Sequence, residues 1–237
     1  MNRVIIWLNG TFGVGKTSTA ERLAALVPDS RVLDPETVGQ LLRANLGDLP
    51  VPDFQDWPAW RPLVAAALIE VARMTGQHVI APQTVLKREY LDQILAPLHA
   101  AELEVFHVVL DASDAVLRSR IDGTDEAKEW RLAHLDEYRT ARLWMVESAD
   151  FVVDTAASTP PQIARRIMAA LPELPDLPEV AVRPRATGAS GATGVTDKPK
   201  ATEKPALEDQ PKAGLAEKPP AADKPQAAEQ PGLADHH

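Results

Sequence analysis

The sequence contains no cysteine, which excludes disulfide bonds, thiolate metal sites and a cysteine nucleophile. It also lacks a long apolar run near its start, because residues 4–8 are too few for a signal peptide or a membrane span. Aromatic residues are absent after Phe151, so the apolar core is expected in the preceding part of the chain. These absences predict a cytoplasmic protein whose apolar core is confined to the earlier part of the chain.

Composition divides the chain into a folded domain, residues 1–172, and a tail, residues 173–237. The tail is rich in Pro, Ala, Lys and Glu and repeats Lys-Pro or Gln-Pro, so it buries too little surface to offset the entropy of ordering. We predict that it is disordered, and its composition names no partner. The net charge of -9 disfavours a nucleic-acid partner.

The motif GxxxxGK[ST] fits residues 10–17 and directly follows the apolar residues 4–8. Its glycines let consecutive backbone N–H groups turn toward a polyphosphate at the positive end of the next helix. Lys16 would reach the terminal phosphates, and Thr17 offers a hydroxyl ligand to Mg²⁺. The alternative is a glycine-rich turn that binds nothing. The strand, loop and helix agree with a site for ATP and Mg²⁺ made of Gly10, Thr11, Phe12, Gly13, Val14, Gly15, Lys16, Thr17 and Ser18.

Apolar segments alternate with helical patterns up to about residue 171. The apolar segments predict strands at residues 30–33, 78–81, 104–110 and 151–153, in addition to residues 4–8. This alternation implies right-handed crossovers and a parallel sheet covered on both faces. The predicted fold class is α/β, a three-layer P-loop NTPase fold with a five-stranded, mainly parallel sheet.

Asp34 follows the second predicted strand, at the sheet edge where ligands gather in parallel α/β folds. Its carboxylate is a candidate catalytic base for a substrate hydroxyl and a candidate ligand of Mg²⁺. The alternative is a helix cap, because Pro35 and Glu36 begin the next helical pattern. These three roles remain open at this point.

The third predicted strand ends without an acidic residue, where many phosphate-loop enzymes place a second metal-binding carboxylate. Either Asp34 or Asp111 therefore takes the metal role, or Mg²⁺ keeps more water and depends on Thr17 and the phosphates. Gln83 and Thr84 follow this strand as candidate substrate contacts, with plain turn residues as the alternative.

A polar segment, residues 122–129, lies where a mobile lid over ATP is expected. Arginine can stabilise the charge of a phosphoryl group during transfer, although each arginine singly is more often a solvated helix residue. Arg120 is the best catalytic and ATP-binding candidate because it ends a helix that enters the segment. The arginines around the segment are Arg118, Arg120, Arg131, Arg139 and Arg142.

Trp57, Trp60 and Arg61 occur in a proline-rich stretch that leads into a helical pattern. They are candidates for an aromatic and cationic wall around a small-molecule substrate. The alternative is that they pack this stretch onto the core.

With these motifs, the chain resembles the small phosphate-loop kinases, a group that includes shikimate kinase and chloramphenicol phosphotransferase. More narrowly, it resembles the ATP-binding tunicamycin-resistance proteins. The resemblance covers about residues 3–171 and is carried by residues 7–17, Asp34-Pro35-Glu36, Asp53-Phe54-Gln55, Trp60-Arg61 and Pro82. It implies an ATP-dependent protein that protects against a nucleoside-like antibiotic. That family has been linked to the membrane through its C-terminal part, but here the polar, proline-rich tail argues against attachment.

The leading hypothesis is a Mg·ATP-dependent kinase that phosphorylates a hydroxyl of a small molecule. One rival is a protein that binds and sequesters the drug in an ATP-dependent way without turnover. Another is a housekeeping nucleoside or nucleotide kinase. The sequence leaves the acceptor and the oligomeric state open.

Overall fold

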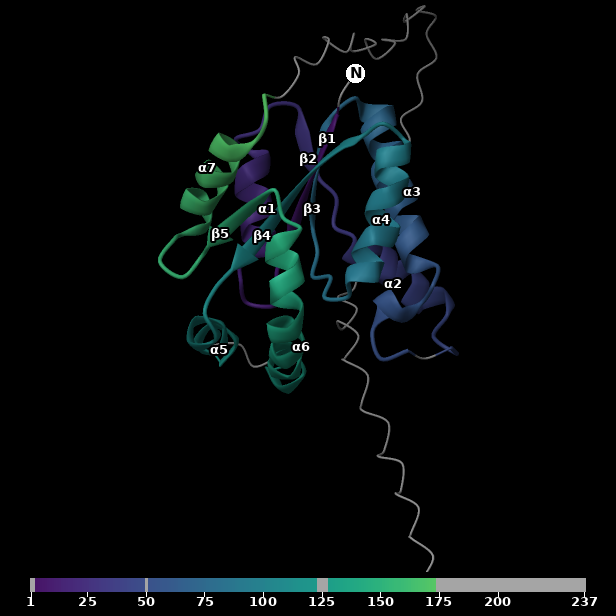
Figure 1. The fold of residues 1–237 in the computed structure, drawn as a ribbon. Coiled ribbons are helices and arrows are strands. Elements are labelled where there is room, and N and C mark those ends of the chain that lie inside the picture. The colour runs from purple at the N-terminus through teal and green to yellow at the C-terminus, as the bar shows by residue number, and fades with distance from the viewer. Residues whose placement is uncertain (1–2, 50, 123–127, 174–237) are drawn as a thin grey trace, which may run out of the picture. The chain divides into compact units, whose positions relative to one another are not determined.

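Strand β1, Val4–Asn9, lies at the centre of the sheet because each of its six residues is apolar or neutral and buried. In the computed structural model, which describes residues 3–49, 51–122 and 128–173, the strand order is β2-β3-β1-β4-β5. All the pairings between these strands are parallel. Helices cover both faces of the sheet (Figure 1).

The elements follow the predicted alternation of strand and helix. The remaining strands are β2 (Ser30–Val32), β3 (His78–Pro82), β4 (Glu104–Asp111) and β5 (Phe151–Asp154). The helices are α1 (Lys16–Ala24), α2 (Glu36–Asn45), the short 3₁₀ helix η1 (Phe54–Asp56), α3 (Trp60–Thr75), α4 (Arg88–Ala100), α5 (Asp114–Asp122), α6 (Lys128–Glu147) and α7 (Pro160–Ala170).

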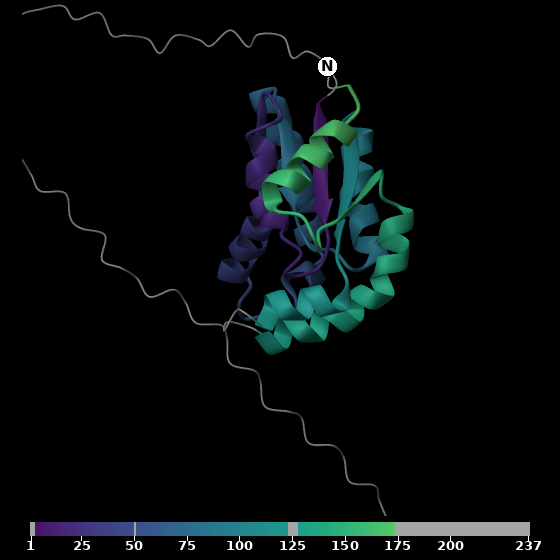
Figure 2. The same ribbon diagram turned by 90° about the vertical axis from the view of Figure 1, so that its left-hand side faces the viewer.

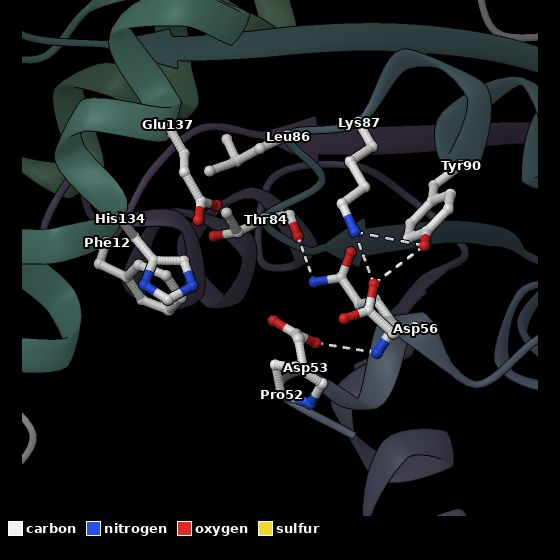
Figure 3. Close-up of a pocket in the computed structure, with 11 residues that line it drawn as sticks. Phe12, Pro52, Asp53, Asp56, Thr84, Leu86, Lys87, Tyr90, His134 and Glu137 are labelled. Atoms are coloured by element: carbon white, nitrogen blue, oxygen red, sulfur yellow. Dashed lines mark hydrogen bonds and ion pairs between the residues drawn. The ribbon is translucent and has the colours of Figure 1, made fainter. Parts of the chain in front are cut away.

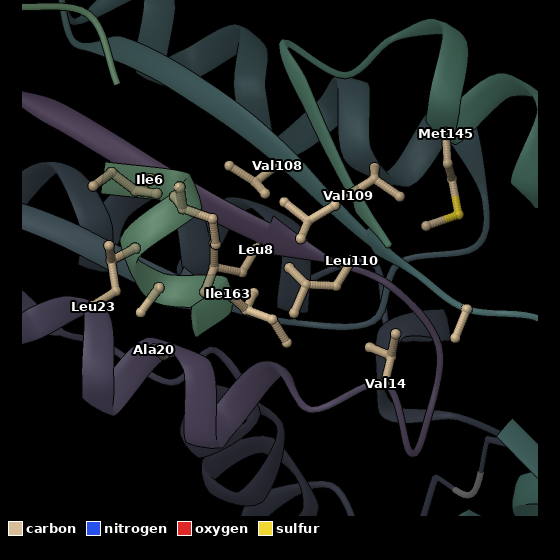
Figure 4. Packing of buried hydrophobic residues seen from close by; sticks show 14 of the residues in the cluster. Ile6, Leu8, Val14, Ala20, Leu23, Val108, Val109, Leu110, Met145 and Ile163 are labelled. Atoms are coloured by element: carbon tan, nitrogen blue, oxygen red, sulfur yellow. The ribbon is translucent and has the colours of Figure 1, made fainter. Parts of the chain in front are cut away.

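Successive residues of β1 point to opposite faces of the sheet and enter two separate cores. Ile6 and Leu8 join a cluster with residues of α1, α6 and α7, and Figure 4 shows several of these side chains. Ile5 and Trp7 join a second cluster with α2, α3 and α4. Figure 1 shows the sheet between its helical layers, and Figure 2 looks onto one face of the sheet with the green helix α7 in front of the strands. Burial on both faces explains why the strands are continuous apolar runs.

The carboxyl ends of the strands form the edge that positions the site. Strand β1 lies between β3 and β4. The chain passes from β1 to β2 on one side of β1, and from β3 to β4 on the other, so the strand order reverses at β1. In open parallel sheets, ligands bind in the crevice outside such a switch point. The loops after β1, β2 and β3 therefore meet where the sequence places its phosphate loop, Asp34 and Thr84.

The predicted α/β fold with a five-stranded sheet and helices on both faces is confirmed. The helical pattern that follows the proline-rich stretch is α3, which begins at Trp60, and η1 occupies part of the stretch before it. The centre of the expected lid, residues 123–127, and the expected tail beyond Glu173 lie outside the described residues. Among the described helices, none has the length and apolarity needed to cross a membrane.

Candidate functional site: a phosphate loop beside an acidic pocket

The phosphate loop leaves β1 with three glycines in the left-handed region of backbone space. Gly10, Gly13 and Gly15 have φ angles of 143°, 76° and 97°. Helix α1 then begins at Lys16 without an acidic residue in its first turn. The buried side chain of Asn9 ties the loop to the chain after β3, because it accepts from Gly10 N at 2.9 Å and exchanges two bonds with the backbone of Val85. The loop is therefore held in a concave form open to an anion.

Gly10 is constrained by close approach as well as by its φ angle. A β-carbon at this position would lie 2.5 Å from the carbonyl oxygen of Leu110, whereas one at Gly15 would meet nothing within 4 Å. We therefore predict that Gly10→Ala lowers the free energy of unfolding by about 2 kcal/mol or more, because clash adds to backbone strain. Gly15→Ala, which bears the strain alone, should lose less. Equal losses in chemical denaturation would contradict this account.

Lys16 folds its side chain back over the loop. Its ammonium donates to the carbonyl oxygens of Gly10 at 3.0 Å and Thr11 at 2.9 Å, and it lies over the ring of Phe12. Burial lowers the pKa of Lys16 to about 7, although the charges of Asp34 and Glu36 oppose this shift. The lysine is thus close to its titration point at neutral pH and would gain charge stabilisation from a bound phosphate.

The lowered pKa of Lys16 predicts that ATP binding takes up a proton. A polyphosphate favours the charged ammonium, so saturating Mg·ATP near pH 8 should take up about 0.9 proton, and near pH 6 about 0.1. Affinity should fall as the pH rises above 7. Calorimetric titration in buffers of different ionisation enthalpy measures this uptake. Lys16→Arg, whose guanidinium stays charged, should abolish it, and an unchanged uptake in that variant would assign the proton to another group.

The other predicted loop residues divide between the interior and the surface. Thr11 is fully buried, and its hydroxyl has no hydrogen-bond partner among the described residues. Val14 belongs to the core cluster that contains α1. Thr17 and Ser18 are exposed on the first turn of α1, where their hydroxyls are accessible to a ligand. Of these residues, Thr17 has the position expected for the metal role.

Arg120 lies against the phosphate loop. It donates to the carbonyl oxygen of Gly13 at 3.4 Å and to the hydroxyl and carbonyl oxygens of Thr155 at 3.1 and 2.7 Å. Thr155 follows β5 and is fully buried. The structure therefore places Arg120 beside the loop, where it bonds to carbonyl and hydroxyl oxygens of the protein. Thr155 is a partner that the sequence analysis did not anticipate.

The remaining arginines of the expected lid are engaged elsewhere. Arg118 and Arg139 both form ion pairs with Asp114 at the start of α5. Arg142 binds Asp111, and Tyr138 donates to the same carboxylate at 2.6 Å. Although burial opposes the shift, these bonds hold the pKa of Asp111 below its usual range.

Asp111 is therefore already neutralised by protein groups, and the metal role that the sequence left open for it is weakened. Tyr138 and Arg142 line a second hollow in the surface, together with Ala112 and Ser113.

Asp34 is half-buried beyond the end of β2. Its Oδ1 accepts from the backbone N–H of Glu36 at 2.9 Å, which is the contact expected of a residue that starts a helix. The same carboxylate is near enough to Lys16 to act on its pKa. The capping contact and the proximity to the phosphate loop therefore coexist, and one carboxylate oxygen remains for a base or metal role.

Trp57, Trp60 and Arg61 are core residues, which corrects the predicted substrate wall. Trp60 is fully buried and its indole donates to the carbonyl oxygen of Pro35, while the indole of Trp57 donates to that of Leu49. Both rings pack in the cluster formed by α2, α3 and α4. The stretch contains Pro50, Pro52, Pro58 and Pro62, and these rings supply the apolar surface that fixes it to the sheet.

Arg61 is buried with them, at 8% exposure, and supports the pocket from behind. Its guanidinium lies over the ring of Tyr90, at 4.1 Å from the centroid. It also donates to the carbonyl oxygen of Gln55 and to Oε1 of Gln93. The guanidinium is therefore used inside the protein rather than on a substrate.

A pocket of about 160 Å³ opens beside the phosphate loop, and Figure 3 shows its lining. Phe12 of the phosphate loop forms one wall and contacts His134 of α6 edge to face, with 5.5 Å between the ring centroids. The pocket is thus shared by the phosphate loop, the segment around η1, the start of α4 and helix α6. Its lining is Phe12, Pro52, Asp53, Gln55, Asp56, Thr84, Leu86, Lys87, Tyr90, His134 and Glu137.

Of the two predicted substrate contacts after β3, Thr84 lines the pocket and Gln83 does not. Gln83 is buried and donates to the carbonyl oxygen of Thr84. Thr84 is 5% exposed, and its hydroxyl has no hydrogen-bond partner among the described residues. Gln55 donates to the carbonyl oxygen of the same residue at 2.9 Å. The hydroxyl of Thr84 is therefore the group of this segment that remains for a ligand.

Asp53 is a carboxylate of the pocket that received no role from the sequence. Its Oδ1 accepts from Gln55 N at 2.8 Å, and the other oxygen faces the pocket (Figure 3). Burial raises the pKa of Asp53, although the bond from Gln55 opposes the shift. The signal available in the sequence was the stretch Asp53-Phe54-Gln55, which the family resemblance included without giving it a role.

The fold and its glycine loop together define a P-loop protein. A family model described as an AAA domain matches residues 5–143. The solved tunicamycin resistance protein of Deinococcus radiodurans is 31% identical, with 71% of this chain and 95% of that chain covered and a TM-score of 0.56. The chain therefore belongs to the AAA domain family and shares a family with that Deinococcus protein.

Other solved structures share the fold at lower identity. A sugar kinase from a Janibacter species is 20% identical, with 71% of this chain and 94% of that chain covered and a TM-score of 0.50. A gluconokinase from Sinorhizobium meliloti is 22% identical, with 70% and 90% covered and the same TM-score of 0.50. At these identities the likeness establishes the fold alone. A comparison with curated proteins finds no match.

Proposed function

We propose that this protein is a Mg·ATP-dependent phosphotransferase that acts on a hydroxyl of a small molecule and so confers resistance to a nucleoside-like antibiotic such as tunicamycin. The observation that carries this proposal is the wall that the phosphate loop shares with the pocket. Phe12 belongs to that loop, and it lines the same space as Asp53 and Thr84. A hydroxyl bound there would lie beside the terminal phosphate. The 31% identical tunicamycin resistance protein supports the type of substrate.

The residues of the loop fit a bound nucleotide. Gly15 leaves open space where a β-carbon would stand, and the buried hydroxyl of Thr11 has no partner among the described residues. Lys16 would exchange its bonds to loop carbonyls for bonds to phosphate oxygens. Mg²⁺ would be held by Thr17 and phosphate oxygens, with Asp34 or water completing its shell, and would neutralise charge that develops on the phosphates.

The proposed reaction is an in-line displacement at the γ-phosphorus. The acceptor oxygen forms a new bond to phosphorus, and the bond from phosphorus to the bridging oxygen of ADP breaks. The proton of the acceptor hydroxyl passes to a carboxylate, and ADP leaves with the bridging electron pair. Lys16 and Arg120 both contact the phosphate loop, and their charge would stabilise the transferred group.

Two carboxylates divide the work in this proposal. Asp34 acts on the electrostatics of Lys16, so we assign it the role of base on the phosphate side. Asp53 lines the pocket, so we assign it the orientation of the acceptor. The alternative metal role of Asp34 is separated from the base role by its response to added Mg²⁺.

Two other functions use the same site. The segment after β3 carries neutral Gln83 and Thr84 where a metal-binding acid is common, and this favours ATP-dependent binding of the drug without turnover as the alternative. A nucleoside or nucleotide kinase is the other. The first would protect a cell while leaving the drug unmodified, and the second would protect no cell.

The proposed resistance is tested by expressing the chain in a tunicamycin-sensitive bacterium. The parent should raise the inhibitory concentration of tunicamycin, and Lys16→Ala, expressed at the same level, should not. Drug recovered from the culture should carry a phosphate group. Protection with unmodified drug would support sequestration instead, and no protection by the parent would overturn the proposal.

A further inference from the structure

We infer that the pocket beside the phosphate loop selects an uncharged, hydroxyl-bearing acceptor and discriminates against an anionic one such as a sugar phosphate or a nucleoside monophosphate. This inference rests on the proposed function, because it names the chemical class of the acceptor. It follows from the charges that line the pocket and from the hydroxyl of Thr84.

The lining contains more carboxylates than ammonium or guanidinium groups. Asp53, Asp56 and Glu137 line the pocket, and Lys87 is the lysine among the lining residues. The ammonium of Lys87 lies 2.6 Å from Oδ1 of Asp56, and Tyr90 donates to the same oxygen at 2.9 Å. The charge of Lys87 is therefore balanced inside the pocket wall.

The titration of the Lys87–Asp56 pair supports this balance. The bond to Asp56 raises the pKa of Lys87. Although desolvation opposes it, the bonds from Lys87 and Tyr90 lower the pKa of Asp56. Both partners thus stay charged over the physiological range and cancel each other. Beside the ring of His134, the described wall presents to a ligand the carboxylate of Asp53 on one side and that of Glu137 on the other, as Figure 3 shows.

An anionic acceptor would need a cation in this space, and the nearby guanidinium does not provide one. Arg61 contacts the lining residues Gln55 and Tyr90, but its side chain is buried behind them and its donors reach Gln55 and Gln93. His134 packs its ring against Phe12. An anion would therefore meet the field of Asp53 and Glu137, and like charges placed together oppose binding.

Thr84 indicates what the pocket does accept. The residue is 5% exposed, and its buried hydroxyl has no hydrogen-bond partner among the described residues. A ligand that bonds to this hydroxyl therefore satisfies a buried polar group. A carboxylate such as Asp53 only accepts hydrogen bonds, whereas a hydroxyl both donates and accepts. A hydroxyl-bearing ligand can therefore donate to the free oxygen of Asp53 and pair with Thr84. A phosphate dianion or a carboxylate group carries no proton to donate to Asp53.

The test compares matched neutral and phosphorylated ligands. The full chain is saturated with Mg²⁺ and a non-hydrolysable ATP analogue, so that the probes cannot occupy the ATP site. Binding is then measured by calorimetry for glucose against glucose 6-phosphate, and for uridine against uridine 5′-monophosphate. We expect at least one neutral probe to bind about tenfold or more tightly than its phosphorylated counterpart.

Charge variants assign the preference to the pocket. The double variant Asp53→Asn, Glu137→Gln should reduce the ratio between neutral and phosphorylated probe. Glu147→Gln, on the same helix as Glu137 but outside the pocket lining, should leave it unchanged. Circular dichroism of each variant verifies that it is folded.

Every result decides the inference. Tighter binding of a phosphorylated probe by the parent, binding of no neutral probe, or a ratio unchanged in the double variant overturns it. The proposed function is judged separately by transfer. Phosphorylation of an anionic acceptor would support the kinase function and contradict the proposed selectivity. Selective binding of neutral probes without phosphate transfer would support the selectivity and contradict the kinase function.

Discussion

Replacing Lys16 with alanine should weaken the binding of Mg·ATP by about 100-fold or more, because the ammonium supplies charge-assisted bonds to the terminal phosphates. The fold should tolerate the change, with a loss of about 1 kcal/mol or less in the free energy of unfolding. Among the described residues, the ammonium bonds to the carbonyl oxygens of Gly10 and Thr11, both within the loop itself. Calorimetric titration measures the affinity, and chemical denaturation measures the stability.

The control removes a cation of the same helix that faces away from the ligand. Arg22 lies in the last turn of α1 and is exposed, so Arg22→Ala should bind Mg·ATP as the parent does. If Lys16→Ala bound Mg·ATP with the parent's affinity, the glycine loop would not be a phosphate site. The interpretation of the carboxyl edge of the sheet as a nucleotide site would then fail.

Asp34→Asn should lower kcat by about 100-fold while leaving the affinity for Mg·ATP nearly unchanged, because asparagine keeps the capping bond to Glu36 but cannot take a proton. Asp53→Asn should instead act mainly on the acceptor and raise its KM by about tenfold. Steady-state kinetics with the phosphorylated acceptor as product measures both. The difference follows from the placement of the two side chains, because Asp34 lies near Lys16 and Asp53 lines the pocket.

Asp48→Asn, an exposed change in the loop after α2, is the matched control and should leave both constants unaltered. Parent-like turnover of Asp34→Asn would reduce Asp34 to a helix cap. Recovery of its rate at high Mg²⁺ would assign it to the metal. A fall in kcat confined to Asp53→Asn would transfer the base role to that residue.

The phosphate loop and the sheet could be predicted because their signals are local. A glycine loop between an apolar strand and an amphipathic helix specifies one supersecondary unit, and residues 4–24 contain all of it. Alternation of strand and helix then predicts the parallel sheet. The edge position of Asp34 follows from the same pattern, since it needs only the end of one strand.

The pocket could not be predicted in the same way because its parts come from distant segments. Phe12, Asp53, Thr84 and His134 meet only through the packing of α6 and the proline-rich stretch. Burial also decides between two interpretations that the sequence left open for Trp60, a substrate wall and packing onto the core. A large aromatic ring in a proline-rich stretch gains more by filling the core, where the exposure of Trp60 is 0%.

The most direct measurement of the central claim is mass spectrometry of tunicamycin after incubation with the purified full chain and Mg·ATP. The account predicts a product heavier by one phosphate group, formed together with ADP, and no such product with Lys16→Ala. Unmodified tunicamycin in the presence of a parent chain that binds both ATP and the drug would contradict it.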